Sequence, residues 1–165
     1  PKTSPYLAPA YALAEGVFLG ALSGFMQTIY PGIVLPAILL TFGVAGSLLA
    51  AYASGLVRAT ENFKLGIMAA TGGIAIVYLA TFVLGFMGIQ IPYIHGSGLI
   101  GIGFSLVVVV IAALNLVLDF DFIEKGVENG APKYMEWYAS FGLLVTLVWL
   151  YLELLRLLAK LQGRD

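Results

Sequence analysis

The chain has 165 residues, of which 61% are hydrophobic and only 10% are charged, and its eight Lys and Arg residues nearly balance nine Asp and Glu residues. Its mean hydropathy is +0.99, so a water-soluble fold would lack the polar surface needed to cover it. The absence of cysteine excludes disulfides and thiol chemistry. We therefore expect the lipid bilayer as the solvent of this fold, and no nucleic-acid partner.

Five long apolar stretches fill almost the whole chain. Each is long enough for a helix that crosses a hydrocarbon core of about 30 Å at about 1.5 Å per residue. None alternates with the period of two that is expected for the strands of an outer-membrane barrel. We predict an all-α integral membrane protein, a polytopic helix bundle that forms one transmembrane domain over residues 1–165. The predicted spans are residues 6–28, 33–56, 65–88, 99–118 and 137–158.

The connections between these spans are short, so consecutive helices are predicted to be antiparallel neighbours. Connections at 58–64 and 125–133 carry Lys and Arg, whereas those at 30–32 and 90–98 carry none. The positive-inside rule places the first two in the cytoplasm. The C-terminus then lies on the opposite side, where Arg156, Lys160 and Arg164 run against the rule.

Small residues recur at every fourth position of the first two spans. This spacing lines them along one helix face, where two backbones can approach closely and dispersion contacts hold helices together in lipid. The predicted helix-packing positions are Gly16, Gly20, Gly24, Gly43 and Gly55.

Polar groups within the spans are the candidates for function, because lipid makes them costly. Glu15 lies about 8 to 14 Å into the membrane by residue counting, with no basic residue at similar depth in the five spans. An unpaired carboxylate at that depth would be largely protonated or would face a polar cavity. A structural hydrogen bond and a functional role are equally compatible with this position.

A second acidic cluster follows the fourth span. Asn115 and Asp119 are four residues apart and share a helix face, while Asp121 aligns with Glu124 and Lys125 on another face. Residue counting places Asp119 near the interface, which fits a solvated helix end. A functional site fits equally well, because two carboxylates among apolar residues are seldom merely solvated.

Glu153 lies in the last span, three residues before Arg156. This spacing permits an ion pair on one helix face, with the Arg156 side chain extending outward to the interface. We interpret the two residues as an interfacial structural pair.

At these residues the chain resembles the Bax inhibitor 1 (TMBIM) family, and its bacterial members in particular. The resemblance covers nearly the whole chain. It rests on residues 14–20 (Ala-Glu-Gly-Val-Phe-Leu-Gly), 118–121 (Leu-Asp-Phe-Asp), 123–126 (Ile-Glu-Lys-Gly), 130–137 (Gly-Ala-Pro-Lys-Tyr-Met-Glu-Trp) and 150–153 (Leu-Tyr-Leu-Glu). Family members have seven helices, so the resemblance implies that the five spans correspond to the third through seventh helices of a bacterial inner-membrane protein.

The resemblance also implies a function, namely a proton-sensitive calcium leak and protection from stress or cell death. In such members, two acidic residues on the last two helices share a protonation-dependent contact that holds a pore closed. Carried over by motif, Asp119 takes the first of these positions and Glu153 the second. An alternative alignment on the tail Leu154–Leu158 places an uncharged residue near Thr146 at the second position.

Two functional hypotheses follow. The first is a pH-gated cation or calcium leak pathway or membrane stress regulator. Its predicted ion- and proton-sensing residues are Asp119, Asp121, Glu15 and Glu153, its supporting polar residues are Asn115, Glu124 and Arg156, and its candidate Ca²⁺ ligands are Asp119 and Asp121. The second is a structural or regulatory subunit that binds other membrane proteins through its glycine-rich faces and transports nothing. We expect no cofactor and no enzyme, because the sequence pairs no nucleophile with a base and has neither a zinc motif nor a phosphate-binding loop.

Overall fold

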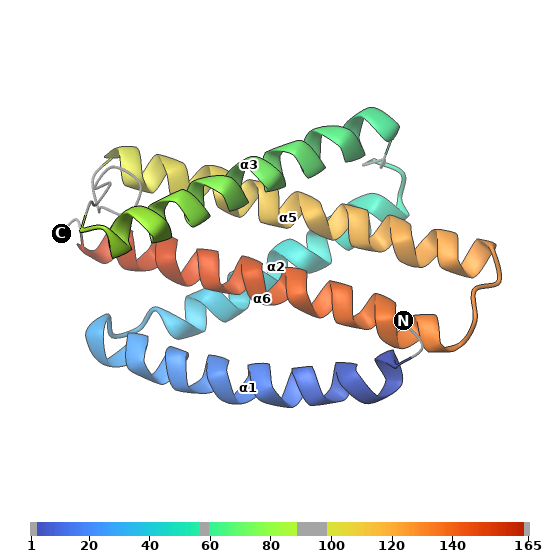
Figure 1. Ribbon diagram of the computed structural model, residues 1–165, viewed down its shortest axis with the longest axis horizontal. Helices are drawn as coiled ribbons and strands as arrows, with labels where there is room; N and C mark the ends of the chain where they lie inside the picture. Colours follow the sequence, from blue (N-terminus) through green and yellow to red (C-terminus); the bar gives the residue numbers. More distant parts are fainter. Residues whose placement is uncertain (1–2, 57–59, 89–98, 164–165) are drawn as a thin grey trace.

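The computed structural model describes residues 3–56, 60–88 and 99–163. In these ranges the chain forms long α-helices and no strand: α1 (Ser4–Ile29), α2 (Val34–Ala53), α3 (Glu61–Phe86), α5 (Leu99–Glu128) and α6 (Tyr134–Gly163) (Figure 1). All five are long and apolar enough to cross a membrane. The fold is thus the predicted all-α polytopic bundle. Arg58 and the connection 90–98, on which the predicted orientation depends, lie outside the described residues.

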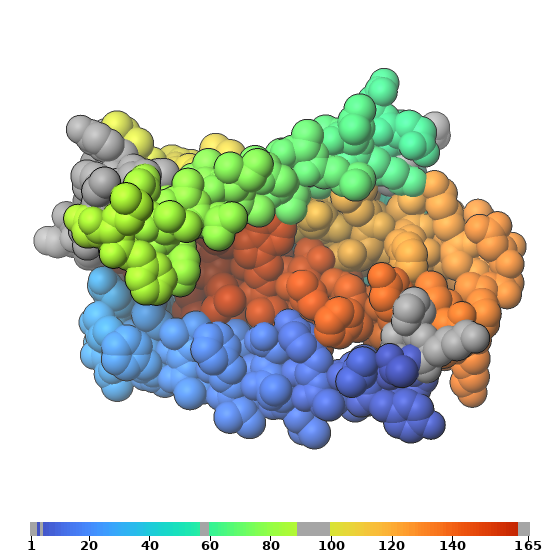
Figure 2. All heavy atoms as spheres, in the orientation of Figure 1, coloured from blue at the N-terminus to red at the C-terminus, as the bar shows by residue number. Residues whose placement is uncertain are grey.

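The C-terminal helix α6 is the centre of the bundle, because it packs against α1, α2 and α5. Helix α5 runs antiparallel to α6 and also packs against α2 and α3 (Figure 1). No described residue of α3 approaches α1 or α6 within 8 Å between Cα atoms. On the face shown in Figure 2, α6 is therefore visible between α1 and α3.

The helices at the centre of the bundle bury more of their residues than the peripheral helices do. Within the most apolar segment of 18 residues in each helix, 44% of the residues of α6 are buried inside the chain, but none of those of α1 are. The α5–α6 core contains Leu116, Phe120, Leu150 and Leu154. A second apolar cluster joins the start of α2 to the end of α6 through Ile33, Ala37, Tyr151, Leu155 and Ala159. Helix α1 therefore presents most of its surface to lipid.

Four helices, α1, α3, α5 and α6, begin before or end after their predicted spans. Helix α5 continues past Leu118 to Glu128, because acidic and basic side chains do not interrupt backbone hydrogen bonding. Beyond Glu128 the chain turns at Gly130, whose φ of 63° suits glycine, and the amide of Ala131 donates to the carbonyl of Gly126 at 3.0 Å. Helix α3 begins at Glu61 because the Thr60 side chain accepts a hydrogen bond from the Phe63 amide. Asp119 and Asp121 consequently lie inside a helix and not at its end.

Candidate functional site in a polar seam

Polar side chains line the contacts of α5 with α3 and α6, inside an otherwise apolar bundle. They come from three helices, and each contacts a polar group on a neighbouring helix. We call this set the polar seam; its members are Thr71 and Tyr78 of α3, Ser105, Asn115 and Asp119 of α5, and Thr146, Glu153 and Lys160 of α6.

Glu153 is the most enclosed carboxylate of the seam, with 5% of its surface exposed. Its Oε1 accepts a 2.8 Å hydrogen bond from the hydroxyl of Tyr78 on α3. Its Oε2 is buried and makes no well-aligned hydrogen bond among the described residues, although the Trp149 side chain also interacts with the carboxylate. The bundle therefore satisfies only part of this carboxylate.

The predicted ion pair between Glu153 and Arg156 does not form. The ion pairs of the described residues involve Lys64 and Lys125, while the Arg156 guanidinium lies over the Tyr78 ring, 5.3 Å from its centroid. A spacing of three residues permits a pair, but the position of Tyr78 decides where both side chains point. The Tyr78 ring makes a cation–π contact with Arg156, and the Tyr78 hydroxyl donates a hydrogen bond to the Glu153 carboxylate.

Asp119 lies against a different part of α6. Its Oδ1 is 4.0 Å from the position that a Cβ would take at Gly142, and it interacts with the Thr146 hydroxyl. Its Oδ2 is buried without a hydrogen-bond partner among the described residues. Thr146 is seven residues before Glu153, about 10 Å along the helix axis. The structure thus separates Asp119 from Glu153 and places Asp119 beside Thr146, in the part of α6 where the alternative alignment puts the second position.

Asn115 and Asp119 have different neighbours although they are one turn apart. The Asn115 side-chain amide donates to Thr71 Oγ1 on α3 at 3.0 Å and to the Ile111 carbonyl at 2.9 Å. Asn115 therefore ties α5 to α3, whereas Asp119 faces α6. The hydrogen bonds of Asn115 do not include Asp119, so they do not support the predicted role of Asn115 beside that residue.

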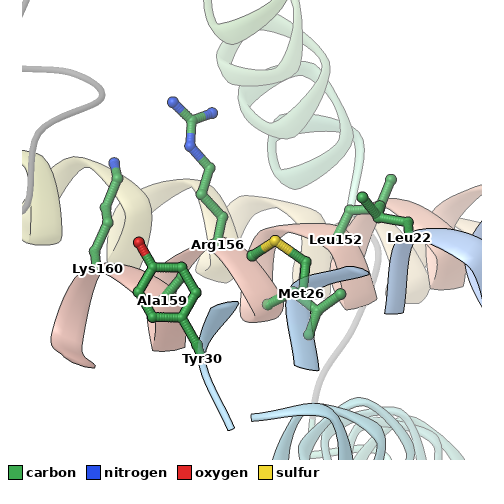
Figure 3. A pocket seen from close by; sticks show the side chains of 8 residues that line it. Leu22, Met26, Tyr30, Leu152, Arg156, Ala159 and Lys160 are labelled. Atoms are coloured by element: carbon green, nitrogen blue, oxygen red, sulfur yellow. The ribbon is translucent and has the colours of Figure 1, made fainter. Parts of the chain in front are cut away.

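Lys160 closes the seam at the C-terminal end of α6. Its ammonium donates to Ser105 Oγ at 2.7 Å and to the Gly101 carbonyl at 3.1 Å, and the residue is 5% exposed. Figure 3 shows that Lys160 and Arg156 extend from α6 in the same direction. Lys160, Ser105 and Tyr78 are parts of the site that are not predicted from the sequence. Hydroxyl groups are ordinary in membrane spans, so only the distances identify these residues.

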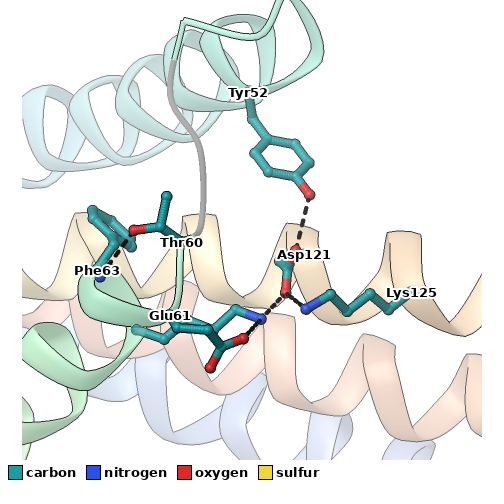
Figure 4. A network of polar contacts seen from close by, with 7 residues as sticks. Tyr52, Thr60, Glu61, Phe63, Asp121 and Lys125 are labelled. Carbon is teal, nitrogen blue, oxygen red and sulfur yellow. Dashed lines mark hydrogen bonds and ion pairs between the residues drawn. The ribbon is translucent and has the colours of Figure 1, made fainter.

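Asp121 forms a separate polar network at the opposite end of the bundle (Figure 4). Its Oδ2 lies 2.7 Å from Lys64 Nζ and 3.3 Å from Lys125 Nζ, and its Oδ1 accepts a 3.4 Å hydrogen bond from the Tyr52 hydroxyl. The predicted alignment of Asp121 with Lys125 is confirmed. The predicted partner Glu124 also interacts with the Tyr52 hydroxyl. This network joins α2, α3 and α5.

The structure does not bring the candidate Ca²⁺ ligands together. Asp119 faces Gly142 and Thr146 of α6, whereas Asp121 is neutralised by two lysines. In residues 3–56, 60–88 and 99–163, no group of three or more Asp, Glu and His side chains could hold a metal ion. Two carboxylates at positions i and i+2 point to different sides of a helix, which explains the separation.

Glu15 lies on the side of α1 that faces α6. One turn earlier, the Tyr11 ring contacts the Phe141 ring edge-on at 4.8 Å, and two turns later Ser23 Oγ is 2.6 Å from the Tyr151 hydroxyl. The half-buried Glu15 keeps its Oε2 buried without a hydrogen-bond partner in the described ranges. It contacts neither Asp119 nor Glu153 through any ion pair or hydrogen bond of the described residues.

The glycine stripes of α1 and α2 do not pack closely against any other part of the chain that the structure describes. A Cβ added at any of the five predicted positions would meet nothing within 4 Å: Gly16, Gly20, Gly24, Gly43 and Gly55. Helix α2 instead packs through larger side chains, including Ala37, Val44, Leu48 and Tyr52. The stripes face away from the other described helices, and a packing role for them stays a prediction about other molecules or segments.

Comparison with known proteins agrees with the five-helix architecture and with the resemblance of the acidic segments. A family model described as Bax inhibitor 1 like matches residues 1–163. No curated protein and no solved structure matches the chain. The match covers all but the last two of the 165 residues. The chain therefore belongs to the Bax inhibitor 1 like family and is a multi-span integral membrane protein.

Proposed function

We propose that this protein is a pH-sensitive cation leak pathway, with calcium among its ions, in a bacterial inner membrane. It belongs, in this proposal, to the bacterial subgroup that its acidic segments resemble. Protonation of carboxylates in the polar seam biases the bundle between a closed and an open packing. The transport is passive and involves no enzymatic step.

The observation that carries this proposal is the environment of Glu153. An ionised carboxylate in an apolar interior is costly unless hydrogen bonds compensate it, and here Oε1 bonds to Tyr78 while the buried Oε2 has only the side chain of Trp149 nearby among the described residues. Loss or gain of one proton therefore changes the free energy of the closed packing. Titration of one buried group that biases two packings is a recurring way of switching a protein.

Tyr78 connects the titrating carboxylate of Glu153 to helix α3. Helix α3 packs on α5 and does not approach α6 within 8 Å between Cα atoms, so the Tyr78 side chain bridges the two helices. A change in the charge of Glu153 alters this bridge and the position of α3 against the seam. Asp119 is the second titrating group, because its Oδ2 is also buried without a partner among the described residues.

The test is ion flux into liposomes that contain the full-length protein, measured with calcium and proton dyes at pH 6 and pH 8. Glu153→Gln keeps an acceptor for Tyr78 but cannot titrate, so the pH response should disappear. Asp119→Asn should weaken the response. The matched controls are Glu136→Gln and Glu128→Gln, whose side chains are exposed on α6 and α5 and should leave the response unchanged.

Equal effects of the seam variants and the exposed controls would contradict a seam sensor. Flux that responds to pH in every variant would contradict it as well. Flux no greater than in empty liposomes would contradict the leak itself.

A second candidate function is supported by the open glycine faces of α1 and α2. Nothing lies within 4 Å of the Cβ positions at Gly16, Gly20 and Gly24, so another membrane helix could approach the α1 backbone closely. On this alternative, the protein is a structural or regulatory subunit of a membrane complex. Gly20→Leu should then abolish co-purification of a membrane partner, while Leu13→Ala, an exposed position off the stripe, should not.

A further inference from the structure

A pocket of about 390 Å³ lies between α5 and α6, close to the connection that joins the two helices. Sites that bind small molecules have volumes of roughly 300 to 1,000 Å³. Tyr138 on its wall is four residues after the start of α6, about 6 Å along the helix axis, so the pocket lies within reach of the aqueous surface. Its walls include Leu118, Asp119 and Phe122 of α5, and Tyr138, Phe141 and Val145 of α6.

Three aromatic residues line this pocket. The rings of Phe122 and Tyr138 come from different helices, and their centroids are 5.9 Å apart at an angle of 54° between the planes. Phe141 is the third, and its ring contacts the Tyr11 ring of α1 edge-on at 4.8 Å. Phe122 and Tyr138 are 44% and 40% exposed, so a ligand in the pocket can contact both rings. The face of an aromatic ring attracts cations.

Asp119 adds a carboxylate to these rings. Its Oδ2 is buried without a hydrogen-bond partner among the described residues. The Thr146 hydroxyl interacts with the carboxylate, but a hydroxyl carries no charge that would balance it. Lys64 and Lys125 bind Asp121 instead, on another side of α5 (Figure 4). Within the described ranges, Asp119 therefore forms no ion pair with Lys or Arg.

One carboxylate beside several aromatic rings selects a particular kind of cation. A metal ion needs several oxygen ligands, and residues 3–56, 60–88 and 99–163 contain no group of three or more Asp, Glu and His side chains that could hold one. A quaternary ammonium ion needs no hydrogen-bond acceptor, because its nitrogen carries no hydrogen. Its charge is spread over alkyl groups that can contact aromatic faces, and the carboxylate balances this charge.

We propose that this pocket binds one quaternary ammonium group, which belongs either to a small free molecule or to a lipid headgroup. Phe122, Tyr138 and Phe141 contact the alkyl groups, and Asp119 pairs with the positive charge. The site goes beyond the proposed leak and does not rest on it, since binding of this group requires no ion to cross the membrane.

The experiment measures the binding of radiolabelled choline, a small quaternary ammonium ion, by equilibrium dialysis. The full-length protein is kept in dodecyl maltoside micelles, which contain no ammonium group. The wild-type protein should bind choline saturably, with one molecule per chain. Tetramethylammonium should displace it. The alcohol 3,3-dimethylbutan-1-ol has the shape of choline without its charge and should not displace choline at the same concentration.

Variants of the pocket separate the charge from the rings. Asp119→Asn should weaken choline binding about tenfold, the effect of one ion pair in a partly enclosed site. Tyr138→Leu should weaken it about two- to fivefold, whereas Tyr138→Phe keeps the ring and should retain it. Trp137→Leu is the matched control, because Trp137 is 43% exposed and is not a wall residue of this pocket. Circular dichroism checks that each variant stays helical.

Reconstitution in nanodiscs distinguishes the two sources of the ammonium group. Choline binding in phosphatidylglycerol nanodiscs that disappears in phosphatidylcholine nanodiscs would support the proposal and identify a lipid headgroup as the occupant. Equal binding in both would support it with a free cation as the occupant.

Three results would overturn the proposal. The first is a wild-type protein in micelles that binds no choline saturably. The second is displacement of choline by the neutral alcohol as effective as that by tetramethylammonium. The third is an equal weakening of choline binding in Trp137→Leu and Tyr138→Leu. None of these results bears on ion flux, so the leak can fail or hold independently.

Discussion

The hydroxyl of Tyr78 on α3 donates a 2.8 Å hydrogen bond to the carboxylate of Glu153 on α6, between two helices whose Cα atoms do not approach within 8 Å in the described residues. The same tyrosine ring receives the Arg156 guanidinium. One side chain therefore connects α3 to the central helix. This makes the bridge a sensitive point for both stability and the proposed switching.

Removal of the Tyr78 hydroxyl should destabilise the protein. Tyr78→Phe removes the hydroxyl that donates to Glu153 Oε1. Because a buried carboxylate oxygen then loses its hydrogen bond, we expect a loss of about 1 kcal/mol in the free energy of unfolding. Equilibrium unfolding in mixed micelles measures it. Tyr6→Phe is the control, because Tyr6 is 81% exposed. Equal stability of the two variants would show that the Tyr78–Glu153 bond does not hold α3 in place.

The Lys160–Ser105 contact should contribute to stability at the other end of the seam. Ser105→Ala removes a neutral acceptor from a buried ammonium, so we expect a loss of about 1–2 kcal/mol in the free energy of unfolding. Thermal unfolding in detergent compares this variant with Ser54→Ala, whose exposed hydroxyl donates to the Ala51 carbonyl of its own helix turn. The prediction fails if Ser54→Ala is the more destabilising of the two.

Lys64 has two acidic neighbours, and the structure ranks them. Its Nζ is 2.7 Å from Asp121, whose side chain is 14% exposed, and 3.9 Å from Glu61, which is 91% exposed. Double-mutant cycles with Lys64→Met should therefore show a larger coupling energy with Asp121→Asn than with Glu61→Gln. Salt should weaken the Glu61 coupling more strongly, because solvent screens it. A reversed order of the two couplings would refute this ranking.

Two glycine substitutions should have opposite effects on stability. Gly20→Ala adds a Cβ with nothing within 4 Å and should raise the stability of the isolated protein by up to about 1 kcal/mol, since alanine is the better helix former. Gly130→Ala should lower it by roughly 1 kcal/mol, because φ at this position is 63°. Thermal melts of both variants measure this. Destabilisation by Gly20→Ala would mean that the α1 stripe packs against another copy of the protein.

Much of the fold could be predicted from the sequence because lipid imposes a simple requirement. Every backbone polar group within a membrane must be satisfied internally, so a long apolar stretch in this chain becomes a helix. The spans that contain Glu15 and Glu153, and the span that directly precedes Asp119, are therefore predictable from the sequence, and so is the family, through its acidic segments. The end of α5 was placed too early, since hydropathy falls at Asp119 while the helix continues to Glu128.

The partners of the polar side chains were not predictable, because they depend on the rotation of each helix about its axis and on which helices are neighbours. Hydropathy does not define either quantity when nearly all faces of a helix are apolar. From the amino-acid sequence alone one can predict a multi-span helical membrane protein with a few carboxylates that are costly to bury in lipid. Only the tertiary structure placed Glu153 against Tyr78, Asp119 against Thr146 and Lys160 against Ser105, because these contacts come from the packing of α3, α5 and α6.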